Sequence, residues 1–156
     1  MDVTGDELAG IVDLFDALTA DELGRALVEL AYRQGEELDP SAFDGDIAAA
    51  LETYHLVAFE PADADDPWLV PGPVAFPELP ENATDLPHML DVPDRSVDRG
   101  RVGAAAEEKF RSDTAEAVAD ENEARIRELL DVSYELEVWG PVDLASARER
   151  LDDALA

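Results

Sequence analysis

Six of the ten prolines in this chain lie between residues 71 and 93, and they limit what that stretch can form. A proline fixes its own φ and has no N–H to donate, so this spacing excludes a long helix and disfavours a central strand. Apolar side chains between the prolines can still pack against a core. We therefore predict an ordered but irregular connector, with one short helical turn after Asp85-Leu86-Pro87.

Before the prolines, apolar residues recur at helical spacing in three segments, 6–18, 20–34 and 41–54. Thr19 and Glu22 have the spacing of a capping box at the start of the second segment. Gly35 suits a left-handed end for the same helix, and Asp39-Pro40 suits the start of the third.

The segments that follow the third predicted helix favour β-strands. Residues 56–59 and 68–70 are apolar runs on either side of an acidic turn at 61–67, which predicts a β-hairpin. Three helices followed by a hairpin is the order of a winged helix. We therefore predict a winged-helix-like domain over 1–76, followed by a Pro-rich connector over 77–101.

The C-terminal half, 102–156, is predicted to be helical and to pack on the first half. Its predicted helices are 102–119, 122–131 and 144–155, the last capped by Asp143. Residues 132–138 alternate apolar and polar side chains, which favours a strand, while their Leu and Glu content is compatible with a helix. Both readings stay open. The predicted fold class is α+β, mostly helical, with a winged-helix-like three-helix plus β-hairpin half and a helical C-terminal half.

The chain carries 39 acidic and 11 basic residues, a net charge of −28, and the acids are spread along its whole length. The Debye length falls from about 10 Å at 0.1 M salt to about 3 Å at 1 M, so molar salt screens this repulsion. Such a composition resembles that of cytoplasmic proteins of extreme halophiles. We expect a chain that is folded in molar salt and expanded in dilute buffer. The alternative is an acidic partner for a basic protein, or a nucleic-acid mimic.

Several functional classes are disfavoured. No apolar run approaches 18 residues, and the N-terminus lacks the regions of a signal peptide, so we expect a cytoplasmic protein without a membrane partner. The absence of cysteine excludes disulfides and thiol catalysis. The sequence has no phosphate-binding glycine motif and no nucleophile elbow, and the acidic turn lacks the glycine and glutamate of an EF-hand. We therefore expect no cofactor, no metal and no enzymatic activity.

Several longer motifs lie between Leu8 and Trp139: Val12-Asp13-Leu14-Phe15, Tyr54-His55-Leu56-Val57, Leu69-Val70-Pro71-Gly72-Pro73, Leu86-Pro87-His88-Met89-Leu90-Asp91-Val92-Pro93-Asp94-Arg95, Leu130-Asp131-Val132-Ser133-Tyr134 and Val138-Trp139-Gly140-Pro141. Over this span the chain resembles a family of uncharacterised proteins from halophilic archaea. The resemblance implies an archaeal cytoplasm and brings no assigned activity with it.

Five of the eleven basic residues fall within seventeen positions: Arg95, Arg99, Arg101, Lys109 and Arg111. Such a local excess could contact a phosphate or an acidic partner. The interpretation that we favour is that these side chains pair with nearby carboxylates and hold the connector in place, since the arginine fork suits a carboxylate.

The third predicted helix exposes Asp44, Asp46 and Glu52 and no cation, which disfavours its use as a DNA recognition helix. His55 ends that helix, where capping or packing is the favoured role. His88 lies among Asp85, Asp91 and Asp94. This group could hold a divalent ion, but a hydrogen bond that fixes the connector is favoured.

Four aromatic residues, Trp68, Trp139, Tyr54 and Tyr134, are expected to anchor an alanine-rich core. A tryptophan exposed beside Phe76 would instead mark a surface for a partner. The predicted function is a non-enzymatic regulatory or adaptor module that binds another protein. The alternatives are a DNA-binding winged-helix transcription regulator, with the 95–111 arginines as phosphate contacts, and a metal- or acid–base-dependent enzyme.

Overall fold

The computed structural model describes residues 1–62 and 64–156, which form two compact units, Met1–Val97 and Asp98–Ala156. The described residues have an α+β fold that is mostly helical, as predicted, with seven α-helices and one two-stranded antiparallel sheet. Most of the predicted connector, residues 77–97, belongs to the first unit. No helix in the described ranges combines the length and the apolar character needed to cross a membrane.

The first unit begins with α1 (Gly5–Leu14) and α2 (Ala20–Arg33), and each starts with a capping box. The box at Thr19 and Glu22 is confirmed by reciprocal hydrogen bonds of 2.8 and 3.2 Å. The predicted extent of the first helix, to residue 18, is wrong. Helix α1 ends at Leu14 because the chain reverses at Asp16, whose φ is 66°, and Leu18 then forms a β-bridge with Leu69.

The third predicted helix is shorter than expected. A 3-10 turn, Pro40–Phe43, precedes α3 (Asp44–Glu52), and the chain leaves the helix through Tyr54, whose φ is 65°. Tyr54 is fully buried at this corner. Phe43, Ile47 and Ala50 face the core, as the helical spacing predicted.

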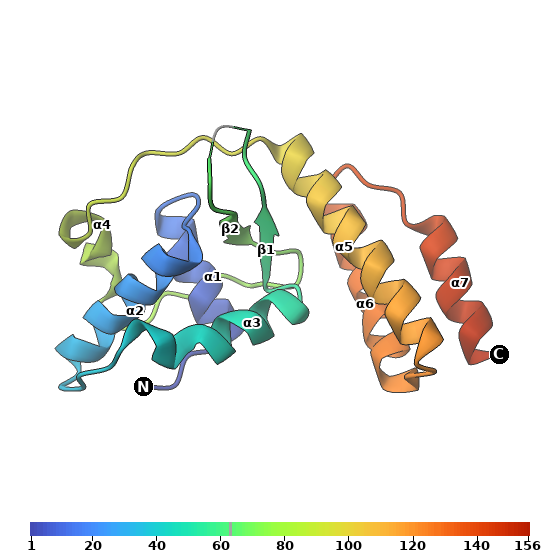
Figure 1. The fold of residues 1–156 in the computed structure, drawn as a ribbon, viewed down its shortest axis with the longest axis horizontal. Coiled ribbons are helices and arrows are strands. Elements are labelled where there is room, and N and C mark those ends of the chain that lie inside the picture. The colour runs from blue at the N-terminus through green and yellow to red at the C-terminus, as the bar shows by residue number, and fades with distance from the viewer. Residues whose placement is uncertain (63) are drawn as a thin grey trace. The chain divides into compact units, whose positions relative to one another are not determined.

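The hairpin is confirmed. Strand β1 (Leu56–Phe59) pairs with β2 (Trp68–Pro71) in an antiparallel hairpin (Figure 1). Their register places Phe59 opposite Trp68. Helix α1 packs on β2 and α3 packs on α1, which encloses one apolar core. The predicted acidic turn includes Asp63, which lies outside the described residues.

The proline-rich stretch is irregular, as predicted, but Phe76, Leu79 and Met89, which were expected to pack, are exposed. A 3-10 turn, Ala83–Asp85, leads into the single helical turn α4 (Leu86–Met89), in which Leu86 is fully buried. The guanidinium of Arg33, at the end of α2, donates to the carbonyl oxygen of Asn82 at 3.0 Å. This bond fixes the start of the turn.

The second unit consists of α5 (Arg99–Ala119), α6 (Glu123–Trp139) and α7 (Ala145–Leu155), which lie side by side (Figure 1). The predicted break at 120–122 is confirmed. Of the two readings left open for 132–138, the helix is the correct one, because Leu129, Val132 and Leu136 point into the unit at helical spacing. The carboxylate of Asp143 accepts from the Ala145 N–H at 3.0 Å at the start of α7.

Candidate functional site

Arg95 is held in a half-buried cluster of the first unit. Its guanidinium donates to both carboxylate oxygens of Glu22, with Nη2 3.0 Å from Oε2, and to the carbonyl oxygen of Ala17 at 3.2 Å. The indole ring of Trp68 lies against it, 5.0 Å from ring centroid to Cζ. These contacts occupy one face of the guanidinium and its N–H donors. Through them, Arg95 connects the end of the connector to α2 and the hairpin.

Glu22 is only 7% exposed, so its charge depends on this cluster. Burial alone would raise the pKa of the Glu22 carboxyl. The hydrogen bonds from Arg95 and from Thr19 outweigh burial and hold that pKa below its ordinary value. The carboxylate therefore stays ionised, and the pair is a structural feature of the fold.

The other four residues of the predicted basic cluster lie on α5 in the second unit. Lys109 pairs with Asp113 at 2.6 Å and Arg111 with Glu107 at 3.1 Å, each one helical turn apart. Arg101 is 3.9 Å from Asp98, in a pair that is largely exposed. Pairing with nearby carboxylates therefore accounts for three of the four charges.

Arg99 differs from these three residues. Its guanidinium lies 4.7 Å from the ring centroid of Trp139, and no carboxylate among the described residues lies within ion-pair distance of it. Arg99 is exposed at the first position of α5. The N–H donors of its guanidinium are therefore available to an anion from another molecule.

The two histidines occupy different environments. His55 packs on Gly5, its Nδ1 is 2.7 Å from the Thr53 hydroxyl, and its Nε2 is 3.7 Å from Asp6. His88 is exposed on α4. In the described ranges, no three His, Cys, Asp or Glu side chains converge closely enough to hold a metal ion.

The surface of α3 is acidic, as the sequence indicates. Asp44, Asp46 and Glu52 are all exposed, and the described part of the hairpin turn adds exposed Asp65 and Asp66. A nucleic-acid phosphate would meet like charge at both places.

The four predicted core aromatics separate into three cases. Tyr54 is fully buried, as predicted. Trp68 and Trp139 are half-buried, and an arginine covers one face of each ring. The prediction for Tyr134 is wrong, since its side chain is 60% exposed. As a helical residue it lies on the outer face of α6, beside the buried Ser133.

Tyr134 and Val138 form an apolar stripe on α6, one turn apart. Val138 is 89% exposed. The centroid of the Tyr134 ring lies 4.6 Å from the guanidinium of Arg148 on α7, and Arg148 in turn donates to Glu137 at 2.6 Å. This bond holds the pKa of the Glu137 carboxyl below its ordinary value and raises the pKa of Arg148. The tyrosine is therefore held in place by a fixed cation.

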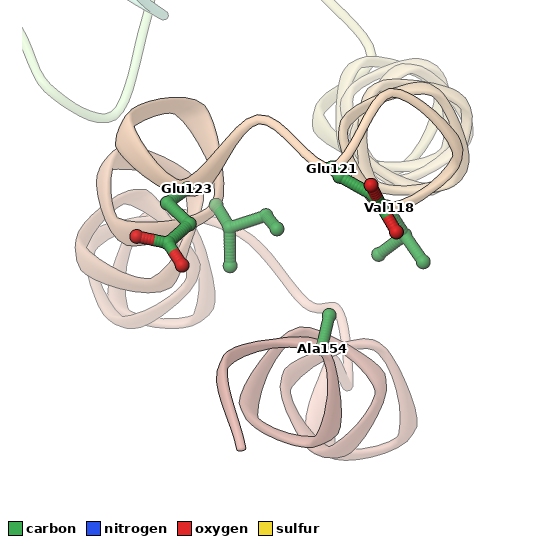
Figure 2. Close-up of a pocket in the computed structure, with 5 residues that line it drawn as sticks. Val118, Glu121, Glu123 and Ala154 are labelled. Carbon is green, nitrogen blue, oxygen red and sulfur yellow. The ribbon is translucent and has the colours of Figure 1, made fainter.

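A hollow of about 480 Å³ lies at the end of the second unit where α5 turns into α6. Figure 2 shows Val118 and Glu121 on one side, Glu123 on the opposite side and Ala154 of α7 on the third. Ile126 completes the lining. The hollow therefore has a small apolar surface between two carboxylates, and among the described residues neither a histidine nor an arginine lines it.

The model of one protein family matches residues 6–156, and that family is described as a family of unknown function (DUF7109). No curated protein and no solved structure matches the chain significantly. The match covers nearly the whole chain and carries no assigned chemistry.

Proposed function

This chain belongs to the family of unknown function DUF7109, and we propose that it is a non-enzymatic adaptor or regulatory module that binds another protein in the cytoplasm of a halophilic archaeon. The single observation that carries the proposal is the exposed stripe of Tyr134 and Val138 on α6. A valine that is 89% exposed on a regular helix adds nothing to the core. Contact with another protein would bury it.

The stripe has the properties of a binding anchor. Helical residues four apart present one continuous surface, which is how a helix face meets a partner. Arg148 holds the Tyr134 ring in place, so a partner would lose little side-chain entropy on contact. Tyrosine is also enriched among the residues that dominate binding energies.

The charge supports the proposed setting. With 39 acidic against 11 basic residues, the chain repels itself strongly unless salt screens it. Apolar contacts do not depend on charge, so they are not lost when concentrated salt screens charges, and an apolar stripe is a suitable contact in that medium.

The second candidate is a DNA-binding winged-helix regulator. The order α1, α2, α3, β1 and β2 favours it, as does Arg99, whose fork has no carboxylate partner among the described residues. The acidic exposed face of α3 weighs against it. Molar salt would also remove most of the counterion-release gain on which DNA binding depends.

The test is affinity capture with the tagged full-length chain in molar KCl, from lysates with and without nuclease treatment. The variant Val138→Asp places a charge in the stripe. The matched control is Ala104→Asp, which adds the same charge at an exposed position of α5 in the same unit.

We expect a specific protein to be captured by the wild type and by Ala104→Asp, with about tenfold less captured by Val138→Asp. Unchanged far-UV circular dichroism would show that both variants are folded. Equal capture by both variants would refute the stripe as the contact. Loss of capture after nuclease treatment would favour the DNA-binding candidate.

A further inference from the structure

A second apolar side chain stands out on the first unit, on a segment that has no regular structure. Phe76 is 80% exposed, and Leu79, three residues on, is 43% exposed. The Phe76 N–H donates to the Asp6 carboxylate at 2.9 Å, and the Glu78 N–H donates to the Asp6 carbonyl at 3.0 Å. The backbone of this segment is therefore fixed to the start of α1 while its apolar side chains face solvent.

The close packing of this segment depends on Gly10. A Cβ at that position would lie 2.1 Å from the Glu78 carbonyl oxygen, so only a glycine lets the two backbones approach. Pro77 and Pro80 restrict the segment further. A partner that contacts Phe76 would thus meet a side chain whose backbone is already ordered, which lowers the entropy cost of binding.

The charge around Phe76 selects the partner. Residues 1–97 contain 23 acidic residues and three arginines. Arg95 is committed to Glu22, Arg33 lies 3.7 Å from Glu29 and bonds to Asn82, and the third arginine, Arg25, is exposed on α2. On the segment itself, Glu78 and Glu81 are exposed on the C-terminal side of Phe76. A partner with arginine or lysine would complement this surface, whereas nucleic acid would be repelled.

We propose that Phe76 is the anchor of a docking surface for a protein segment that carries an apolar side chain flanked by arginine or lysine. The apolar contact supplies the part of the affinity that survives in concentrated salt, and the carboxylates supply the preference for a basic sequence. This surface lies in the unit that does not contain Tyr134 and Val138, so the proposal rests on different residues from those of the stripe on α6.

The experiment uses two fluorescent peptides, one with a leucine between arginines and one with serine in place of that leucine. Their binding to the full-length chain is measured by fluorescence anisotropy in molar KCl. The test variant is Phe76→Ser. The matched control is Tyr32→Ser, which removes another aromatic of the same unit that is 64% exposed.

We expect the leucine peptide to bind the wild type and Tyr32→Ser about tenfold more tightly than the serine peptide does. In Phe76→Ser this difference should disappear. Equal affinities of the two peptides for the wild type, or a difference that survives Phe76→Ser, would overturn the proposal.

A third peptide, with glutamine in place of each arginine, tests the charge. At the lowest KCl concentration at which the chain stays folded, where the carboxylates are least screened, it should bind the wild type several-fold more weakly, and the double variant Glu78→Gln and Glu81→Gln should reduce that difference. Equal binding of the arginine and glutamine peptides would overturn the basic character of the partner. Because the test does not involve Val138, it can fail while the proposed function stands, and the reverse also holds.

Discussion

Arg95 and Glu22, which are 73 residues apart in the chain, form an ion pair in which the guanidinium donates to both carboxylate oxygens. The same carboxylate closes the capping box of α2 by accepting from the Thr19 N–H at 2.8 Å. One buried charge therefore holds the start of α2 and the end of the connector together. Removal of either partner would leave the other charge buried and uncompensated.

Replacement of Arg95 with methionine should lower the free energy of unfolding by about 3 kcal/mol, because Glu22 would keep its burial and lose its cation. The measurement is urea unfolding in molar KCl, followed by Trp68 fluorescence in a Trp139→Phe background. The control is Arg25→Met, at an exposed position of α2, the helix that carries Glu22. It should change the free energy of unfolding by less than about 0.5 kcal/mol. Similar losses in both variants would contradict the role of the pair.

Acidification should weaken the same contact. The pKa of Glu22 is lower in the folded chain than its ordinary value, since the bonds from Arg95 and Thr19 outweigh burial. The stabilisation is then present above the unfolded-state pKa and is lost as the pH falls through the folded-state pKa. Between about pH 6 and pH 3, the free energy of unfolding should fall more steeply in the wild type than in Glu22→Gln. Parallel curves would contradict this.

Salt should act more strongly on the first unit than on the second. Residues 1–97 contain 23 acidic residues and three arginines, whereas 98–156 contain 16 acidic and eight basic residues. Each unit has one tryptophan, Trp68 or Trp139. In the full chain, the Trp139→Phe variant leaves Trp68 as the probe of the first unit, and the Trp68→Phe variant leaves Trp139 as the probe of the second. As KCl is removed, we expect Trp68 fluorescence to report unfolding at a higher KCl concentration than Trp139 fluorescence does. Equal stability in dilute buffer and in molar KCl would refute the halophilic interpretation.

Local signals in the sequence predicted the regular elements well. Thr19 and Glu22 are three residues apart and form the expected capping box, and Gly35 has the positive φ of 85° that its place after α2 requires. The alternation over 132–138 could not be interpreted locally. Both periods place Val132 and Leu136 on one face, and only their packing within the second unit selects the helix.

Contacts between residues far apart in the chain could not be predicted from the sequence. Any of the 39 acids could have been the partner of Arg95, and only the folded chain brings Glu22 to it. The exposure of Tyr134 was missed because an alanine-rich chain was expected to bury its large aromatic side chains, and because Arg148, which lies against the ring, comes from another helix. The sequence also suggested that Phe76 would pack as one of the apolar anchors of the connector, and that prediction is wrong, since its side chain is 80% exposed. Nor could the sequence show that Asp6 fixes the backbone there.

Replacement of Gly10 and of Gly45 with alanine should change the free energy of unfolding in opposite directions. Gly10→Ala brings a Cβ to 2.1 Å from the Glu78 carbonyl oxygen and should lower the free energy of unfolding by about 2 kcal/mol or more, since the backbone has to move. Gly45 lies on α3, and a Cβ added there would meet no described atom within 4 Å, so Gly45→Ala should raise stability by about 0.5 kcal/mol. Urea unfolding of both variants in molar KCl makes the comparison. A stable Gly10→Ala variant would contradict the close approach of residues 76–79 to α1.

Thr114 offers a test of the core of the second unit. Its hydroxyl is buried on α5 and has no hydrogen-bond partner among the described residues. Thr114→Val removes this unpaired group at nearly constant shape, so the free energy of unfolding should rise, by up to about 1 kcal/mol.

Ser133 is the matched control, because its buried hydroxyl donates to the Leu130 carbonyl at 2.6 Å. Ser133→Ala should therefore lose stability, by about 1 kcal/mol. Urea unfolding followed by Trp139 fluorescence in a Trp68→Phe background measures both changes, and a loss in Thr114→Val would mean that this hydroxyl has a partner.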